Sequence, residues 1–253
     1  MNSPMSRQTL SSLIILCVIL SISACTPSSK TGAGVPVEWK GALKNMMRKG
    51  DISAQVNLQH FQKTEHLYAL GAVAELKGEI LVLDGLPLIA SVQDQAIIVD
   101  TTYDSDATLL VYTSVEDWVS TSIAAKTMNK EALEQQLELV AESNGLNLDR
   151  PFPFLLRGLV NTADWHVINW PKGDKEHTHE KHISSGLSGT IKDEEVEILG
   201  FYSKHHHAIF THHTTNMHMH VRTLDNSIVG HLDDLILARG VELLLPQITT
   251  KAE

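Results

Sequence analysis

The chain has 253 residues, and its 20 lysines and arginines against 30 aspartates and glutamates give a formal net charge of −10 at neutral pH. A surface with this acidic balance is a poor match for nucleic-acid phosphates, so we expect no nucleic-acid partner. Cys17 and Cys25 are its only cysteines, and cleavage between them would exclude an intramolecular disulfide.

The first 25 residues have the pattern of an export signal. Arg7 is their only charged residue, an apolar run extends from Leu13 to Ile22, and small residues precede Cys25. The apolar run is too short to span a membrane comfortably. This ending resembles the lipobox of bacterial lipoproteins, which implies removal of residues 1–24 and lipid attachment to Cys25. The alternative is an ordinary signal peptide with a nearby cysteine.

A flexible tether is predicted for residues 25–36, because this stretch is rich in Ser, Gly, Thr and Pro. Residues 37–253 then form the folded domain, with lobes at approximately 37–160 and 161–253. Loss of residues 1–24 removes one base and no acid, which leaves 19 bases against 30 acids, or −11. We expect an exported protein on the periplasmic side of a bacterial membrane, which it contacts only through its lipid anchor.

Short apolar runs alternate with turn residues from residue 70 onward, and this spacing predicts strands. The first expected strands are Leu70–Leu76, Ile80–Leu83, Leu86–Val92, Ala96–Val99 and Thr108–Thr113. A helix is predicted for Lys130–Ser143, with Gly145 as its stop signal. Strands are expected again at Phe154–Val160, Trp165–Ile168 and within Glu195–Leu245, with a polar loop at Pro171–Ser188. This mixture predicts a sheet-rich α/β or α+β fold.

Histidines are concentrated near the end of the chain. On a strand, His218 and His220 would point to the same face, because side chains alternate between faces. A symmetric two-residue turn at Asp225–Asn226 would pair residues whose numbers sum to 451, which places His231 opposite His220. A shift of the strand register by one residue would turn the His231 side chain to the opposite face of the sheet. Gly230 indicates either a bulge or a close backbone approach.

Three converging neutral imidazoles with positions left open are typical of a catalytic zinc site. Iron, manganese or copper could use the same nitrogen ligands. The alternative is that these histidines lie in the core or on the surface without a metal. His177 to His182 occupy a charged, loop-like segment, where we expect solvated side chains. For His205–His207 and His212–His213, the sequence leaves packing, contact with the ligands and adventitious metal binding open.

Three blocks resemble the α-acetolactate decarboxylase family. They are Leu70–Gly85 (LGAVAELKGEILVLDG), the Pro-Phe-Leu-Leu-Arg-Gly stretch that ends at Gly158, and His-x-His followed eleven residues later by Gly-His. The resemblance extends from about residue 50 to 245. It implies a two-lobed, sheet-rich α/β fold with a zinc site on a β-hairpin, formed by His218, His220 and His231. It also implies an active-site glutamate at Glu79 and a substrate-binding arginine at Arg157.

The implied reaction is zinc-dependent decarboxylation of 2-acetolactate, or of a related 2-hydroxy-3-oxo acid, to acetoin and CO₂. A divalent ion would withdraw electrons from the substrate oxygens. Arg157 would position the carboxylate, and a protonated Glu79 would return a proton to carbon. Alternatively, Arg157 pairs with a buried carboxylate and Glu79 lies in a solvated turn. The family also brings a C-terminal carboxylate toward its metal, but Glu253 is left unassigned.

A different class of function is also compatible with the sequence. The excess histidines and the lipid anchor suit an extracytoplasmic zinc-buffering lipoprotein on the same scaffold. A zinc hydrolase has no supporting motif such as His-Glu-x-x-His. The expected partner of the enzyme is a small-molecule substrate, and a homodimer is compatible with the sequence.

Overall fold

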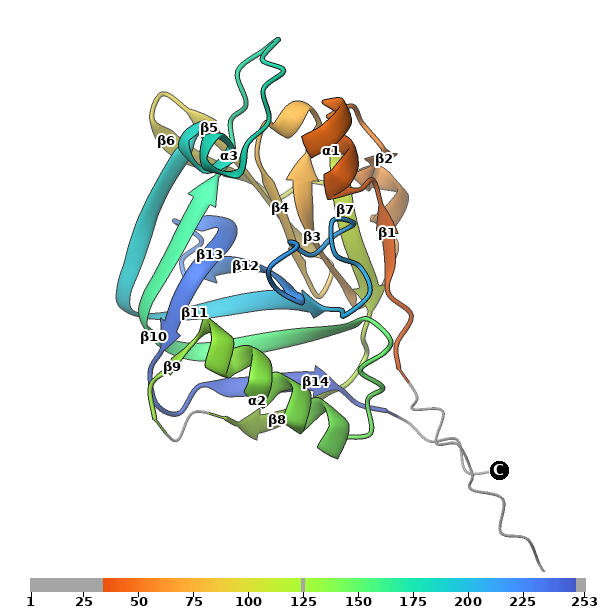
Figure 1. Ribbon diagram of the computed structural model, residues 1–253, viewed down its shortest axis with the longest axis vertical. Helices are drawn as coiled ribbons and strands as arrows, with labels where there is room; N and C mark the ends of the chain where they lie inside the picture. Colours follow the sequence, from red (N-terminus) through yellow and green to blue (C-terminus); the bar gives the residue numbers. More distant parts are fainter. Residues whose placement is uncertain (1–33, 124–125, 249–253) are drawn as a thin grey trace, which may run out of the picture. The chain divides into compact units, whose positions relative to one another are not determined.

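The computed structural model describes residues 34–123 and 126–248 (Figure 1). The predicted signal sequence, Cys25 and Glu253 lie outside these residues. All of the described residues belong to one compact unit. In the described ranges, no helix combines the length and apolar character needed to cross a membrane.

The first sheet is antiparallel and has the order β1-β7-β3-β4-β5-β6, with β2 paired to β7. Its strands are β1 (Glu38–Lys40), β2 (Val56–Asn57), β3 (Leu67–Val73), β4 (Glu79–Leu83), β5 (Leu86–Gln93), β6 (Ala96–Asp100) and β7 (Asp106–Ser114). The short helices α1 (Leu43–Lys49), η1 (Leu58–Phe61) and η2 (Ala74–Leu76) lie between them in sequence. The strand predicted to reach Leu76 ends earlier, at Val73. Glu75 and Leu76 have φ values of 58° and 52°, which an extended strand cannot accommodate.

The second sheet has the order β8-β14-β10-β11-β12-β13-β9. Its strands are β8 (Trp118–Ser122), β9 (Met128–Asn129), β10 (Phe152–Val167), β11 (Leu187–Tyr202), β12 (Met217–Thr223), β13 (Val229–Leu237) and β14 (Glu242–Pro246). The two strands predicted between residues 154 and 168 are one long strand, β10, which runs beside the equally long β11 (Figure 1). The chain passes from the first sheet to the second between Ser114 and Trp118. Residue 160, the expected end of the first lobe, lies within β10 of the second sheet.

Strand β10 also pairs with β13, so strands β10, β11, β12 and β13 form a closed circuit of pairings. This closure places one row of residues across three strands, because His166 pairs with His231 and His231 pairs with His220. The imidazole of His166 is thereby brought to those of His220 and His231, although it is far from them in sequence.

Two helices belong to the second half of the chain. α2 (Lys130–Ser143) has the bounds predicted from its spacing, and its buried side chains include Leu133, Leu137 and Val140. Asn129 caps it by accepting a hydrogen bond from the Ala132 amide. α3 (His179–Ser184) lies in the segment predicted as a loop. It is a short helix of polar composition, so the apolar periodicity that predicts longer helices is missing.

Both sheets contribute to the same hydrophobic core. Leu70 and Leu81 of the first sheet belong to it, together with Leu199 and Phe201 of the second. Full burial of side chains of this size stabilises a fold by about 1.5–3 kcal/mol each. This shared core brings the start of β4 close to the β12–β13 hairpin, and the candidate site lies there.

Candidate metal centre

The β12–β13 hairpin has the register predicted from the sequence. His220 pairs with His231, Val221 with Gly230, and Arg222 with Val229. The connection is longer than the predicted two-residue turn, since the Thr223 amide donates to the Ile228 carbonyl across residues 224–227. The added residues are symmetric about Asp225–Asn226, so the pairing is preserved.

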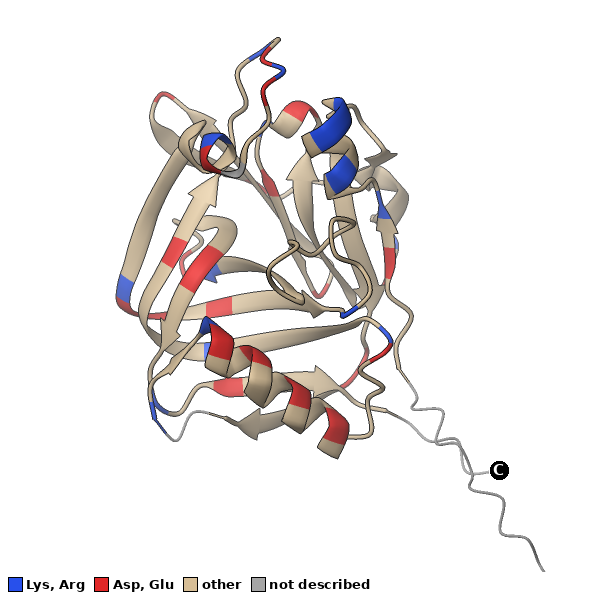
Figure 2. Cartoon of the chain, viewed as in Figure 1, with Lys and Arg blue, Asp and Glu red and all other residues tan. Residues whose placement is uncertain are grey.

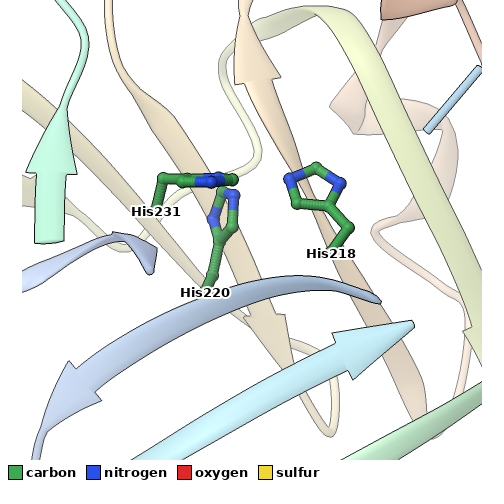
Figure 3. Close-up of side chains that lie close together, drawn as sticks. All are labelled: His218, His220 and His231. Carbon is green, nitrogen blue, oxygen red and sulfur yellow. The ribbon is translucent and has the colours of Figure 1, made fainter. Parts of the chain in front are cut away.

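Three histidine side chains converge on the inner side of this hairpin. One potential ligand atom from each of His218, His220 and His231 lies within 4.8 Å of the other two. Their ring centroids are 5.1–5.3 Å apart, and Figure 3 shows the rings turned toward a common point. His220 is fully buried and His218 is nearly so. The cluster therefore has the size and orientation needed to surround one ion.

The chemistry of these nitrogens also suits a metal. Nδ1 of His218 and both ring nitrogens of His220 are buried without a hydrogen-bond partner of ordinary geometry. Burial lowers the pKa of His218 to about 3 and holds the pKa values of His220 and His231 well below the usual range. A buried polar group without a partner costs about 1–3 kcal/mol. Neutral imidazoles with free lone pairs are the form that binds a divalent ion, which would remove this cost.

Glu79 reaches the cluster from the other sheet. It begins β4, and its side chain is buried. Its Oε2 lies 3.6 Å from Nε2 of His220, and its Oε1 accepts a hydrogen bond of 3.3 Å from the Ile168 amide. Burial raises the pKa of Glu79 to about 8, against the opposing effects of His166 and the Ile168 amide. The carboxyl group is therefore mostly protonated at neutral pH and can donate a proton.

Two further residues of the site, His166 and Asp233, were missed in the sequence. Nδ1 of His166 lies 2.8 Å from Oδ2 of Asp233, and its Nε2 lies 3.9 Å from Oε1 of Glu79. The β10–β13 register shifts at this point and leaves Asp233 as the extra residue of a bulge. Burial alone lowers the pKa of His166, but the contact with Asp233 outweighs this effect and the pKa is raised overall. The bulge thus directs a carboxylate toward a buried imidazole beside the cluster.

With the exception of the fully buried His220, these groups line a cavity of about 460 Å³. Its polar lining includes Glu79, Lys130, His166, His182, His212, Thr214, Thr215, His218, His231 and Asp233. Apolar side chains such as Leu76, Leu109, Ile168, Phe210 and Leu232 complete it. A volume of this size accommodates a small organic acid.

Comparison with known proteins agrees with this architecture. No protein-family model and no curated protein sequence matches the chain. Among solved structures, α-acetolactate decarboxylase from Bacillus subtilis strain 168 is similar with a TM-score of 0.66 over 84% of this chain and 86% of that one, at 13% identity. The chain has the acetolactate decarboxylase fold. A Staphylococcus aureus protein of unknown function, described as similar to that enzyme, gives a TM-score of 0.65 at 12% identity, with 83% and 85% coverage.

Arg157 is the one predicted active-site residue of the described ranges that the fold does not bring to the histidines. It lines a separate cavity of about 340 Å³ with Glu195, Glu197, Arg222 and others. Its Nε donates to Oε1 of the buried Glu197 at 2.7 Å, and Arg222 binds the other oxygen of that carboxylate. The arrangement corresponds to the alternative considered above, a pairing with a buried carboxylate. The motif match carried no information about which cavity the side chain faces.

The remaining histidines have separate surroundings. The ring of His177 stacks on Trp170 with centroids 4.4 Å apart, and its Nδ1 lies 3.0 Å from Nε2 of His182. These two histidines are therefore packed against neighbours, whereas solvated side chains were expected. His206 stacks on Phe210 at 4.8 Å. His207 bonds Asn216. Of all the histidines in the described ranges, only His218, His220 and His231 belong to a three-ligand group.

Proposed function

We propose that the protein is a metal-dependent decarboxylase that converts 2-acetolactate, or a related 2-hydroxy-3-oxo acid, to acetoin and CO₂. The observation that carries this proposal is the approach of the buried Glu79 carboxyl to His220, 3.6 Å away, beside a cavity that Glu79 lines together with the other two histidines of the cluster. A proton donor beside a site for a divalent ion is what decarboxylation of such an acid needs. The acetolactate decarboxylase fold supports this assignment.

His218, His220 and His231 would hold the ion, and we propose zinc because neutral histidines with open positions suit it. Another divalent transition metal remains compatible with nitrogen ligands. When bound, the ion would supply electron withdrawal from the substrate's hydroxyl and ketone oxygens while the carbon–carbon bond to the carboxylate breaks.

Glu79 would complete the reaction. The electron pair of the broken bond stays on the substrate as CO₂ leaves, and the carbon then needs a proton. Glu79 holds one at neutral pH because burial raises its pKa to about 8. The Ile168 amide, which donates to Oε1, fixes the orientation of the carboxyl group. Positioned general acids of this kind accelerate a step by about 10²–10⁴-fold.

A zinc-buffering protein on the same scaffold is the alternative function, and the chain's 14 histidines favour it. Its structural requirement is a set of accessible, separate sites. In the described part of the chain, one three-ligand group is present and it lies inside a cavity. Metal analysis after dialysis separates the two functions. One tightly held ion per chain supports the enzyme, and several exchangeable ions support the buffer.

The decisive functional test is product analysis. Zinc-loaded protein incubated with 2-acetolactate is expected to release acetoin and CO₂ in equal amounts, faster than the spontaneous reaction. Protein stripped with a chelator is expected to match the spontaneous rate, and added zinc should restore turnover. Equal rates from the loaded and stripped forms would overturn the proposal.

We also propose that the protein is exported and anchored to a bacterial membrane through a lipid on Cys25. The support is the sequence alone: an apolar segment that ends in small residues before a cysteine, followed by a Ser- and Gly-rich stretch. Mass analysis of the N-terminal peptide from the membrane fraction tests it. A Cys25→Ser variant is expected to lose the lipid and leave the membrane fraction. An unmodified cysteine in the wild-type protein would contradict the proposal.

A further inference from the structure

Lys130 supplies a positive side chain to the cavity of the metal centre. It is the first residue of α2, and it is the only lysine or arginine among the described residues that line this cavity. Its Nζ donates a 2.7 Å hydrogen bond to the carbonyl of Asp233, the residue at the β10–β13 bulge. That bond fixes the ammonium group between α2 and the hairpin strand.

The ammonium group has donors left for a ligand. A lysine ammonium has three N–H groups, and the bond to the Asp233 carbonyl uses one of them. Of the nearby carboxylates, Oδ2 of Asp233 faces His166 and Oδ1 of Asp234 accepts from the Leu235 amide. Oδ1 of Asp233 is buried and has no hydrogen-bond partner, so it makes no hydrogen bond with Lys130. Burial lowers the pKa of Lys130, and the charges of Asp234 and Asp233 oppose that effect.

No other residue of α2 could compete with Lys130 for an anion, because no other residue of this helix is basic. α2 carries four glutamates, and Lys130 is its one basic residue (Figure 2). Among the imidazoles that line the cavity, His218 and His231 are the proposed ligands of the ion and His166 is paired with Asp233. Arg157, expected to bind the substrate carboxylate, lines the separate cavity. Apart from a bound ion, Lys130 is therefore the one lysine or arginine of the described cavity lining that can recognise an anion.

We infer that Lys130 binds the carboxylate of a small 2-hydroxy acid in the cavity beside His218 and His231, and so takes the role expected of Arg157. The inference rests on the proposed function for the identity of the acid. A charge-assisted hydrogen bond from the ammonium group would orient the carboxylate while the acid's hydroxyl faces the histidine cluster. Lys130 is a specificity-determining residue in this account, because it selects acids over neutral hydroxy ketones.

Two unreactive probes separate this role from catalysis. 2-Hydroxy-2-methylpropanoate keeps the hydroxyl and carboxylate of the substrate but has no ketone. 3-Hydroxy-3-methylbutan-2-one keeps the hydroxyl and ketone but has no carboxylate. Binding of each to the zinc-loaded protein is measured by calorimetry for wild type, Lys130→Gln, Lys130→Arg and the control Lys192→Gln. Lys192 is an exposed lysine of β11 outside the cavity.

Lys130→Gln is expected to weaken binding of the acid about tenfold or more, in keeping with the loss of a charge-assisted hydrogen bond. Binding of the neutral ketone should be unchanged, and Lys130→Arg should keep most of the affinity for the acid. Wild-type affinity for the acid in Lys130→Gln would overturn the inference. An equal loss for both probes, with lower thermal stability, would also overturn it, because that result indicates a purely structural role.

A measurement on the unmodified wild-type protein covers the case in which the variants fail to fold. Lysines are acetylated with a limiting amount of acetic anhydride, and the extent at Lys130 is read by peptide mass analysis. The acid probe should protect Lys130, whereas the ketone and the control site Lys192 should show no protection. Protection of Lys130 by neither probe would contradict the inference. Lys130-dependent acid binding without acetoin formation would instead refute only the proposed reaction.

Discussion

Oε2 of Glu79 lies 3.6 Å from Nε2 of His220, although the two residues belong to different sheets. The packing of the sheets is therefore part of the site. Glu79→Gln keeps the shape of the side chain and removes its transferable proton. We expect this variant to retain zinc and to lose about 10²–10⁴-fold in kcat, which steady-state acetoin assays with metal analysis can measure.

Glu75→Gln is the matched control for that experiment. Glu75 is exposed, lies four residues earlier and does not line the cavity. It should show wild-type turnover. Full activity in Glu79→Gln would mean that Glu79 does not deliver the proton.

Gly230 allows β13 to approach β10 closely beside the cluster. A Cβ atom at this position would lie 2.6 Å from the carbonyl oxygen of His166, closer than real contacts allow. Gly230→Ala should therefore push His231 and His166 apart, lower the free energy of unfolding by about 1–3 kcal/mol and weaken zinc binding. Gly34→Ala, which meets no atom within 4 Å, is the control. Unchanged urea unfolding in Gly230→Ala would contradict the described approach.

Two arginines bind the buried carboxylate of Glu197, and they differ in the number of hydrogen bonds that they donate and in their exposure. Arg222 donates two hydrogen bonds to it, at 3.0 and 2.6 Å, whereas Arg157 donates one and is half-exposed. Arg222→Gln should lower the free energy of unfolding by about 2–4 kcal/mol, because it leaves a buried charge poorly compensated. Arg157→Gln should cost only about 1 kcal/mol. Urea denaturation gives both values, and the reverse order would refute this description.

Asp225 stabilises the turn that sets the register of His220 and His231. The Ser227 amide and the Thr223 hydroxyl lower the pKa of Asp225 to about 2, against an ordinary value of 3.8. A lowered folded-state pKa contributes stability that is present above the ordinary value and lost as the pH falls toward 2. The difference in unfolding free energy between wild type and Asp225→Ala should thus be constant from pH 5 to 7. It should shrink between about pH 4 and pH 2, and a difference that persists at low pH would contradict this.

Local patterns predicted much of the fold. Short apolar runs separated by turn residues located the strands near residues 80–113, and helical spacing gave the bounds of α2. The pairing of His220 with His231 followed from the symmetry of a turn a few residues away, and a longer turn with the same symmetry preserved it. Each of these features depends on neighbours in sequence.

The rest of the site depends on long-range contacts. His166 meets the cluster only because β10 closes onto β13, and no turn links those strands in sequence. Asp233 follows His231 by two residues, so the sequence predicts that both lie on one strand. The direction of the Asp233 side chain, however, is set by the bulge. Lys130 carried no signal beyond its place at the start of a helix. For Arg157, the motif match named a residue but not the cavity it faces.

The most direct test of the account is acetoin release from racemic 2-acetolactate by the zinc-loaded protein, measured with bound zinc for wild type and His220→Ala. His60→Ala, an exposed histidine outside the cavity, serves as the control. We predict zinc-dependent acetoin from wild type and His60→Ala, and the loss of both zinc and acetoin in His220→Ala. Full zinc and full acetoin release in His220→Ala would contradict the assignment of this cluster as the catalytic metal centre.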